Sequence, residues 1–292
     1  MATTRREYSQ ARWSVSPTVT GVLVRTLQYG VLIFFALVCL VPFFWVIASS
    51  LKSNRELAIN TLGLPMNYQW DNYSDAWTRG RFGKYFMNSV IVSLPTVIGS
   101  VLLAALGGYG FARFKVRGGQ FLFYLFLLGL MVPFQSIMIP LFYILRDFKM
   151  LGTYWAFIIP SIALGLPFGI FFMRAFFIRM PQELAEAAKI DGASELQVFW
   201  RIMLPLATPG ITSLAVFSFM GAWNSFLLPL IYLQKDELRP LVLGLMFFRG
   251  RFTTNIPLTM AGTMIVMLPI VLVYILFQRK FIQGMTAGAV KE

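Results

Sequence analysis

Acidic side chains, the groups in this sequence best suited to chemistry, are concentrated in one stretch. Of the 12 Asp and Glu residues, four lie within residues 181–205, namely Glu183, Glu186, Asp191 and Glu195. The sequence has no histidine, which excludes histidine-ligated metals, histidine triads and histidine proton relays. Neither a G-x-S-x-G element nor paired carboxylates within an apolar run is present, so no catalytic constellation is recognised. Residues 181–205 are too polar to cross a membrane and therefore indicate a surface element.

The first half of this stretch predicts a short amphipathic helix. Pro181 suits a first helical turn, and Glu183 would then lie near the positive end of the helix dipole. Gly192, preceded by Asp191, suits the left-handed residue that ends a helix. The helix would carry an apolar face with small residues at its centre, formed by Leu184, Ala187, Ala188 and Ile190.

The second half predicts another helix that leads into a membrane span. Ser194 and Gln197 have the spacing of a capping box, and Pro205 would open the next apolar run. Val198, Phe199 and Ile202 would give this helix an apolar side. The product is a helix–turn–helix across the ends of the spans. Two roles remain equally open for it: insertion into a cleft of another protein, or a membrane-surface link between two spans.

The elements that must position this segment are membrane-spanning helices. The chain has 292 residues, 58% of them hydrophobic and only 13% charged, whereas a soluble domain has about 25% charged residues. Each of six apolar segments can cross about 30 Å of hydrocarbon. These segments lie at 27–51, 85–112, 120–145, 152–178, 206–233 and 258–279. The sequence therefore predicts an all-α membrane protein with six transmembrane helices, the first too long to be a cleaved signal peptide.

Particular residues within the spans predict bends and close contacts. Prolines in or beside the spans predict kinks, at Pro42, Pro95, Pro133, Pro140, Pro160, Pro167, Pro229 and Pro269. A run of small residues should admit another helix, through Ala104, Ala105, Gly107, Gly108 and Gly110.

Basic residues predict which side of the membrane each segment faces. The net charge of +13 is attributed to topology and anionic headgroups rather than nucleic acid. The acid-free loop 113–119 and the tails, the first of which holds Arg5, Arg6, Arg12 and Arg25, indicate the cytoplasmic side. Segments 52–84 and 234–257 also hold Lys and Arg, so the orientation rests on the short loop and the tails. The expected divisions are a cytoplasmic N-terminal tail at 1–26, a first transmembrane helix at 27–51, an extracytoplasmic segment at 52–84, a transmembrane core at 85–280 that includes loop 181–205, and a cytoplasmic C-terminal tail at 281–292.

Polar residues within the spans are candidates for a substrate path, because such residues usually face the bundle interior. They are Asn88, Gln135, Trp223, Asn224 and Ser225. An amide beside an aromatic face would suit a sugar. Hydrogen bonding between helices is the alternative that we favour. In the segment 52–84, Trp70, Tyr73 and Trp77 have helical spacing, which indicates interfacial anchors or a contact surface for an external protein.

The fixed spacing within residues 186–205 resembles the EAA signature of ABC importer permeases. It consists of Glu186-Ala187-Ala188, then Asp191-Gly192-Ala193, then Ile202-x-Leu204-Pro205. Further similarity lies in Asn88-Ser89, in Ala222-Trp223-Asn224 with Pro229-Leu230, and in the segment from Gly284 to Lys291. Together these features resemble the maltose-type carbohydrate-uptake branch over roughly residues 30–291.

The resemblance implies a MetI-like ABC importer permease fold in which loop 181–205 is a cytoplasmic coupling helix. The implied partners are an ABC ATPase dimer, a second homologous permease, an extracytoplasmic solute-binding protein, a carbohydrate substrate and the lipid bilayer. Glu186 would pair with a basic ATPase residue, and Gly192 would permit the turn. The implied ATPase-coupling residues are Glu183, Glu186, Ala187, Ala188, Asp191, Gly192, Ala193, Ile202, Leu204 and Pro205.

ATP and Mg are expected in the partner ATPase, with no cofactor in this chain. The one Gly-Lys pair, Gly83-Lys84, is followed by Tyr85 where a phosphate-binding loop needs Ser or Thr. The expected location is the inner membrane of a bacterium or archaeon, as a multi-pass protein. A permease for a non-sugar solute such as glycerol-phosphate is an alternative. A secondary transporter is disfavoured, because no span centre carries an acid.

Overall fold

The computed structural model describes residues 19–114, 117–250 and 254–289. The basic residues Arg5, Arg6, Arg12 and Lys115, together with Lys291, lie outside these ranges. Within them the chain is helical, and its one β-bridge joins Arg249 to Thr254. The expected all-α fold is confirmed.

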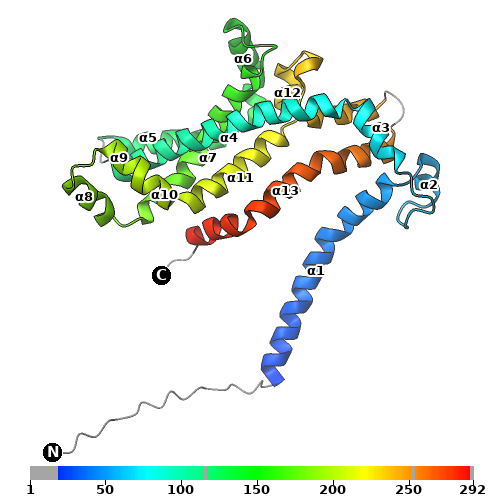
Figure 1. The fold of residues 1–292 in the computed structure, drawn as a ribbon, viewed down its shortest axis with the longest axis horizontal. Coiled ribbons are helices and arrows are strands. Elements are labelled where there is room, and N and C mark those ends of the chain that lie inside the picture. Colours follow the sequence, from blue (N-terminus) through cyan, green and yellow to red (C-terminus); the bar gives the residue numbers. More distant parts are fainter. Residues whose placement is uncertain (1–18, 115–116, 251–253, 290–292) are drawn as a thin grey trace, which may run out of the picture.

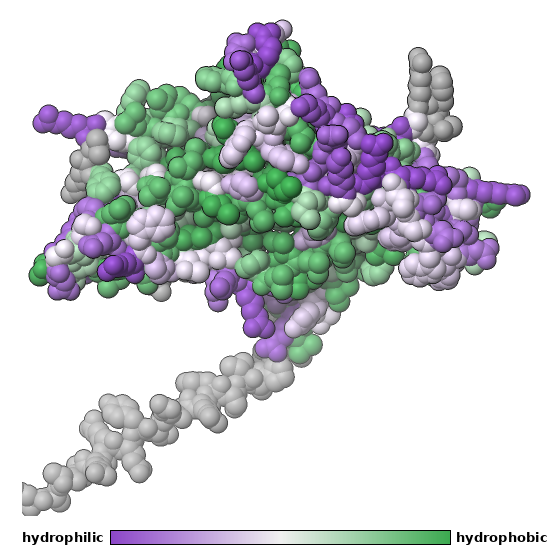
Figure 2. All heavy atoms as spheres, turned by 45° about the horizontal axis from the view of Figure 1, so that its top comes forward, coloured by the Kyte–Doolittle hydropathy of each residue, from purple (hydrophilic) through white to green (hydrophobic). Residues whose placement is uncertain are grey.

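In the part of the chain that the structure describes, four helices are long and apolar enough to cross a membrane: α1 (Val19–Ser50), α4 (Phe82–Arg113), α7 (Trp155–Arg179) and α13 (Ile256–Ala289). Two bent helix pairs bring the possible spans to six. Short helices at the two ends are α2 (Asn54–Ile59), α3 (Asp71–Arg79), α8 (Glu183–Ile190) and α9 (Glu195–Val198). Hydrophobic residues gather across the middle of the molecule, with hydrophilic residues towards its edges (Figure 2).

The bundle is built around the close contact of α4 with α7. A Cβ added to Gly108 would lie 2.7 Å from the Cβ of Met173, and one added to Gly169 would lie 2.7 Å from the Cβ of Ala104. Small residues at these crossings let the two backbones approach, as the sequence predicted. In Figure 1, α11 (Thr208–Trp223) runs beside this pair and α13 runs beside α11, whereas α1 diverges from the bundle.

The predicted span at 120–145 is two helices. The first, α5 (Gly119–Leu128), continues into the 3₁₀ turn η1 (Gly129–Met131), and α6 (Phe134–Asp147) leaves at 100°. Pro133 has no N–H to continue a helix, and Val132 before it is extended, with φ −85° and ψ 110°. The proline therefore breaks the span instead of kinking it.

The predicted span at 206–233 is also broken, into α11 and α12 (Leu227–Tyr232). Residues after α12 form two 3₁₀ helices, η3 (Asp236–Leu238) and η4 (Leu241–Phe248). The outer helices extend beyond the expected tail boundaries, since α1 begins at Val19 rather than near Leu27 and α13 continues to Ala289. Apolar length predicts what lies in the membrane, but a helix continues until its hydrogen-bond pattern is broken.

Candidate functional site

The helix–turn–helix at residues 181–205, here called the EAA loop, lies where α4 and α7 end (Figure 1). We call this the EAA end of the bundle, and the end that carries α2 and α3 the opposite end. Gly192 adopts φ 85°, and the Ala193 N–H donates to the Ala188 carbonyl at 2.9 Å. The predicted left-handed end of α8 is confirmed, because a glycine carries no Cβ penalty in this conformation.

The predicted capping box is present at the start of α9. The Ser194 Oγ accepts from the Gln197 N–H at 3.4 Å, and the Gln197 Oε1 accepts from the Ser194 N–H at 2.8 Å. The helix then widens into a π-helical turn, η2 (Phe199–Met203), followed by α10 (Leu204–Leu206). Pro205 therefore lies within α10 and does not open the next span. A bend of 77° separates α10 from α11, which begins at Thr208.

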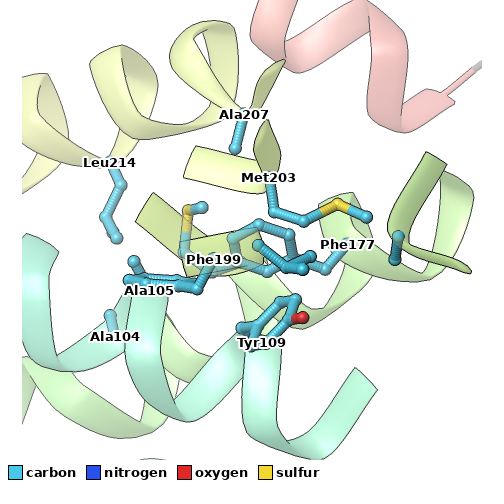
Figure 3. Packing of buried hydrophobic residues seen from close by; sticks show 11 residues of the cluster. Ala104, Ala105, Tyr109, Phe177, Phe199, Met203, Ala207 and Leu214 are labelled. Carbon is cyan, nitrogen blue, oxygen red and sulfur yellow. The ribbon is translucent and has the colours of Figure 1, made fainter. Parts of the chain in front are cut away.

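A buried aromatic cluster fastens the second half of the EAA loop to the spans. The ring centroid of Tyr109 lies 5.5 Å from Phe177 of α7 and 5.2 Å from Phe199 of η2. Figure 3 shows these rings grouped together, with Met203 and Ala207 beside them. Buried aromatic pairs at such distances add attraction beyond the burial of their area. The loop is thus packed onto α4 and α7, and does not merely join two spans.

Polar contacts link the two helices of the EAA loop to each other and to α4. Lys189 and Glu195 form an ion pair across the turn. The Tyr109 hydroxyl also donates to Glu195, at 3.3 Å. Glu183, Glu186 and Asp191 make no ion pair within the described residues. Of the four acids in the loop, three are therefore available on the surface.

The predicted apolar face of α8 divides into two faces. Ala185, which the sequence analysis missed, packs with Ala188 against the cluster. Leu184, Ala187 and Ile190 point away from it, and Ile190 is 87% exposed. Ala193, Ile202 and Leu204 are half-buried, whereas Pro205 is exposed. The outer face of α8 is thus apolar, contains a small residue and lies beside two acids.

Asn88 holds a segment at the opposite end. Its Nδ2 donates to the carbonyls of Glu237 and Arg239 at 2.7 and 2.9 Å, and its Oδ1 accepts from the Tyr154 hydroxyl at 2.8 Å. The Ser89 hydroxyl accepts from the Leu241 N–H at 2.7 Å. Each polar atom of the Asn88 amide is therefore engaged between elements of this chain.

Asp236 holds the same segment through its carboxylate. The Tyr85 hydroxyl donates to it at 2.5 Å, and Arg81 forms an ion pair with it. The hydrogen bond from Tyr85, with Arg81 and Arg239 nearby, lowers the pKa of Asp236 from its ordinary value of 3.8. We call the segment 236–241, fixed to the start of α4 in this way, the latch.

The other candidate path residues do not converge on one site. Trp223 is buried, and its Nε1 donates to the Val266 carbonyl at 3.0 Å. Gln135 is exposed near the start of α6. Asn224 is exposed and Ser225 half-buried at the break between α11 and α12.

A groove of about 220 Å³ lies between α4, α7 and α11. Its walls include the hydroxyls of Ser100, Ser161 and Ser218. The rings of Phe168 and Phe217 also line it, with centroids 5.8 Å apart. The sequence analysis missed this set, because one serine in an apolar helix is common and only the fold brings three helices' hydroxyls together.

The bundle and its attached loop define a multi-pass membrane transport subunit. Residues 100–287 match the family described as "Binding-protein-dependent transport system inner membrane component". The chain therefore belongs to this family, the inner-membrane permease subunits of ABC importers. This membership favours that class over the secondary transporter considered from the sequence.

Similar proteins are known in several organisms. The diacetylchitobiose uptake system permease protein NgcG of Streptomyces coelicolor is 36% identical, over 90% of this chain and 87% of its own length. The arabinooligosaccharides transport system permease protein AraQ of Halalkalibacterium halodurans is 35% identical, over 88% of this chain and 93% of its own. A crystal structure of a bacterial ABC transporter that imports the acidic polysaccharide alginate has a similar chain, with a TM-score of 0.76 and 21% identity, covering 90% of this chain and 98% of that one. That likeness supports the MetI-like permease fold.

Proposed function

We propose that this permease carries a sugar or oligosaccharide, and that its EAA loop receives the movement of a separate ATPase in the cytoplasm. The observation that carries the proposal is the division of α8 into two faces. Ala185 packs against the span ends, while Leu184 and Ile190 stay exposed beside Glu186. An apolar helix face rimmed by charge is suited to a groove in a partner protein.

The substrate class is supported by the relatives and by the groove. NgcG is named for the uptake of diacetylchitobiose and AraQ for the transport of arabinooligosaccharides. Because these two relatives are named for different sugars, they support oligosaccharides as the substrate class of this chain and do not identify one compound. The groove combines hydroxyls with aromatic rings, the two kinds of group that suit a carbohydrate. Its lining contains no charged side chain, which disfavours an anionic solute such as glycerol-phosphate.

The remaining partners follow from the same scheme. ATP and Mg would bind the ATPase dimer, and a solute-binding protein would deliver substrate at the opposite end, which we assign to the extracytoplasmic side. Both termini would lie in the cytoplasm. A second permease subunit would complete the path. That subunit or lipid would cover the most apolar stretch of α1, of which 0% is buried by this chain.

Two substitutions in the EAA loop test the coupling role. Glu186→Lys reverses the exposed charge, and Gly192→Val places a branched side chain at φ 85°, which costs about 1–3 kcal/mol. Both variants are expected to lose ATPase co-purification and vesicle uptake while still inserting into the membrane. Asp71→Lys, an equal charge change on exposed α3 at the opposite end, is the control for insertion and should retain the ATPase during purification. Normal uptake by both loop variants would refute the coupling assignment.

The groove is tested separately through the substrate. Ser218→Leu replaces a hydroxyl by a larger apolar side chain in the groove wall and is expected to abolish oligosaccharide uptake while the ATPase still co-purifies. Uptake of labelled oligosaccharides and of glycerol-phosphate is measured in parallel on the wild type. Uptake of glycerol-phosphate alone would contradict the sugar assignment without affecting the coupling one.

A further inference from the structure

A cavity of about 490 Å³ lies between α4, α5 and α7 at the EAA end. We propose that it binds the phosphate headgroup of one anionic phospholipid, with Arg174 as the ligand of the phosphate. The cavity lies apart from the substrate groove and from the EAA loop, and the preceding proposals do not depend on it. We call it the Arg174 cavity.

Arg174 is a cation without a carboxylate partner in the part of the chain that the structure describes. Its Nε donates to the Phe111 carbonyl at 3.3 Å, and its guanidinium carbon lies 4.2 Å from the centroid of the Phe123 ring. These two contacts fix the plane of the guanidinium and use only one of its nitrogens. A half-buried arginine in a span otherwise needs a counter-charge, and the terminal nitrogens of arginine match the oxygens of a phosphate.

The walls of the cavity suit the part of a lipid next to its phosphate. Phe111 and Phe123 supply apolar surface, and Gly107 and Gly110 form a floor without side chains. A Cβ added to Gly110 would meet nothing closer than 4.0 Å, so the space above this glycine is open. Phosphate and apolar chain could thus be held together, which distinguishes a lipid from a free anion.

The position of the cavity matches the headgroup level of one leaflet. Arg174 lies in the last turns of α7, and Phe111 in the last turn of α4. Arg113 and Arg117 follow in the loop 113–119, which contains no acid. Basic residues clustered at the ends of spans attract anionic lipids. The depth of Arg174 therefore suits the phosphate of a phospholipid, and the surrounding positive charge favours an anionic phospholipid over a zwitterionic one.

A bound lipid would act on the helices that carry the EAA loop. Met173 and Phe177 of α7 belong to the cluster beneath the loop, whereas Arg174 between them lines the cavity. In α4, Tyr109 likewise packs in the cluster, and Phe111 faces the cavity. The same two helix ends thus contact the loop on one side and the proposed lipid on the other.

The experiment uses native mass spectrometry of the complete importer complex taken from nanodiscs of phosphatidylcholine and phosphatidylglycerol in equal parts. The wild type is expected to retain one phosphatidylglycerol, and Arg174→Gln to lower this occupancy about tenfold, because a hydrogen bond to a charged group is lost. Arg279→Gln removes the same charge from an exposed position on α13, outside the cavity lining and the loop 113–119, and should retain the lipid. Arg174→Lys, which keeps the charge, is expected to retain it in part.

Three results of the mass spectrometry would overturn the proposal. They are equal retention of phosphatidylcholine by the wild type, equal loss of lipid in the Arg279 and Arg174 variants, and displacement of the lipid by millimolar inorganic phosphate, which would indicate a free-anion site. The wild-type comparison of the two lipids stands even if Arg174→Gln fails to assemble. A peptide segment of a partner subunit found across the cavity in the complex would also refute the assignment.

Discussion

Replacing Phe199 by alanine is expected to separate ATPase binding from transport. Phe199 is 2% exposed, and its ring centroid lies 5.2 Å from Tyr109 and 6.4 Å from Phe177. Truncation of a buried phenylalanine costs about 3–5 kcal/mol. Because this ring holds the EAA loop against the spans, the population of detached loops should rise roughly a hundredfold or more.

The outer face of α8 does not depend on this cluster. Leu184 and Glu186 point away from it, so the ATPase should still co-purify with the Phe199→Ala complex. Movement of the ATPase would then no longer reach α4 and α7, and vesicle uptake should fall while ATP hydrolysis continues. Hydrogen exchange of residues 183–205 is the direct measurement, and it should accelerate because the loop opens more often.

Trp200→Ala is the matched control, since it removes an aromatic ring from the next residue. The Trp200 ring contacts Phe199, with centroids 5.1 Å apart, but it is 44% exposed and lies outside the buried cluster, so its loss should change uptake and exchange far less than the loss of Phe199. Should Phe199→Ala transport as well as Trp200→Ala, with equal exchange protection in residues 183–205, the cluster would not be the connection between loop and spans.

Two further predictions concern the bundle and the latch. Gly108→Ala would place a Cβ 2.7 Å from the Cβ of Met173 and should lower the melting temperature of the complex. Gly110→Ala is the control, because its Cβ would meet nothing closer than 4.0 Å and should leave the melting temperature unchanged. Equal melting temperatures of the two variants would contradict the α4–α7 packing. Because the hydrogen bond from Tyr85 keeps the pKa of Asp236 below 3.8, the latch should be fully stabilised at neutral pH and loosen as the pH falls below that value. Proteolysis of residues 236–248 at pH 7 and pH 3 checks this, and equal rates would refute it.

Local signals in the sequence were sufficient to predict the EAA loop in outline. A glycine is needed where φ reaches 85°, and Ser194 with Gln197 satisfies the first backbone groups of a helix within four residues. Neither feature depends on the rest of the fold. The α4–α7 contact was predictable for a similar reason, since the small residues that permit it lie close together in one helix.

Features that depend on distant residues could not be predicted from the sequence. The acceptors of the Asn88 amide lie at Glu237 and Arg239, far along the chain, so the sequence did not show whether the amide was free for substrate. The orientation of α8 also depends on the spans beneath it, which is why Ala185 was missed. Pro133 was identified as a kink, but a 100° break requires the rest of the bundle to accommodate α6.

The two alanines on the inner face of α8, Ala185 and Ala188, make a stiff contact with the spans. Alanine has no side-chain torsion that could relax under load. A push on the outer face therefore cannot be absorbed by a rotamer change at Ala185 or Ala188, and must displace the backbone against the aromatic rings. Those rings are close-packed and compress little. A displacement of this short helix would thus be transmitted to the ends of α4 and α7 with little reduction in its size.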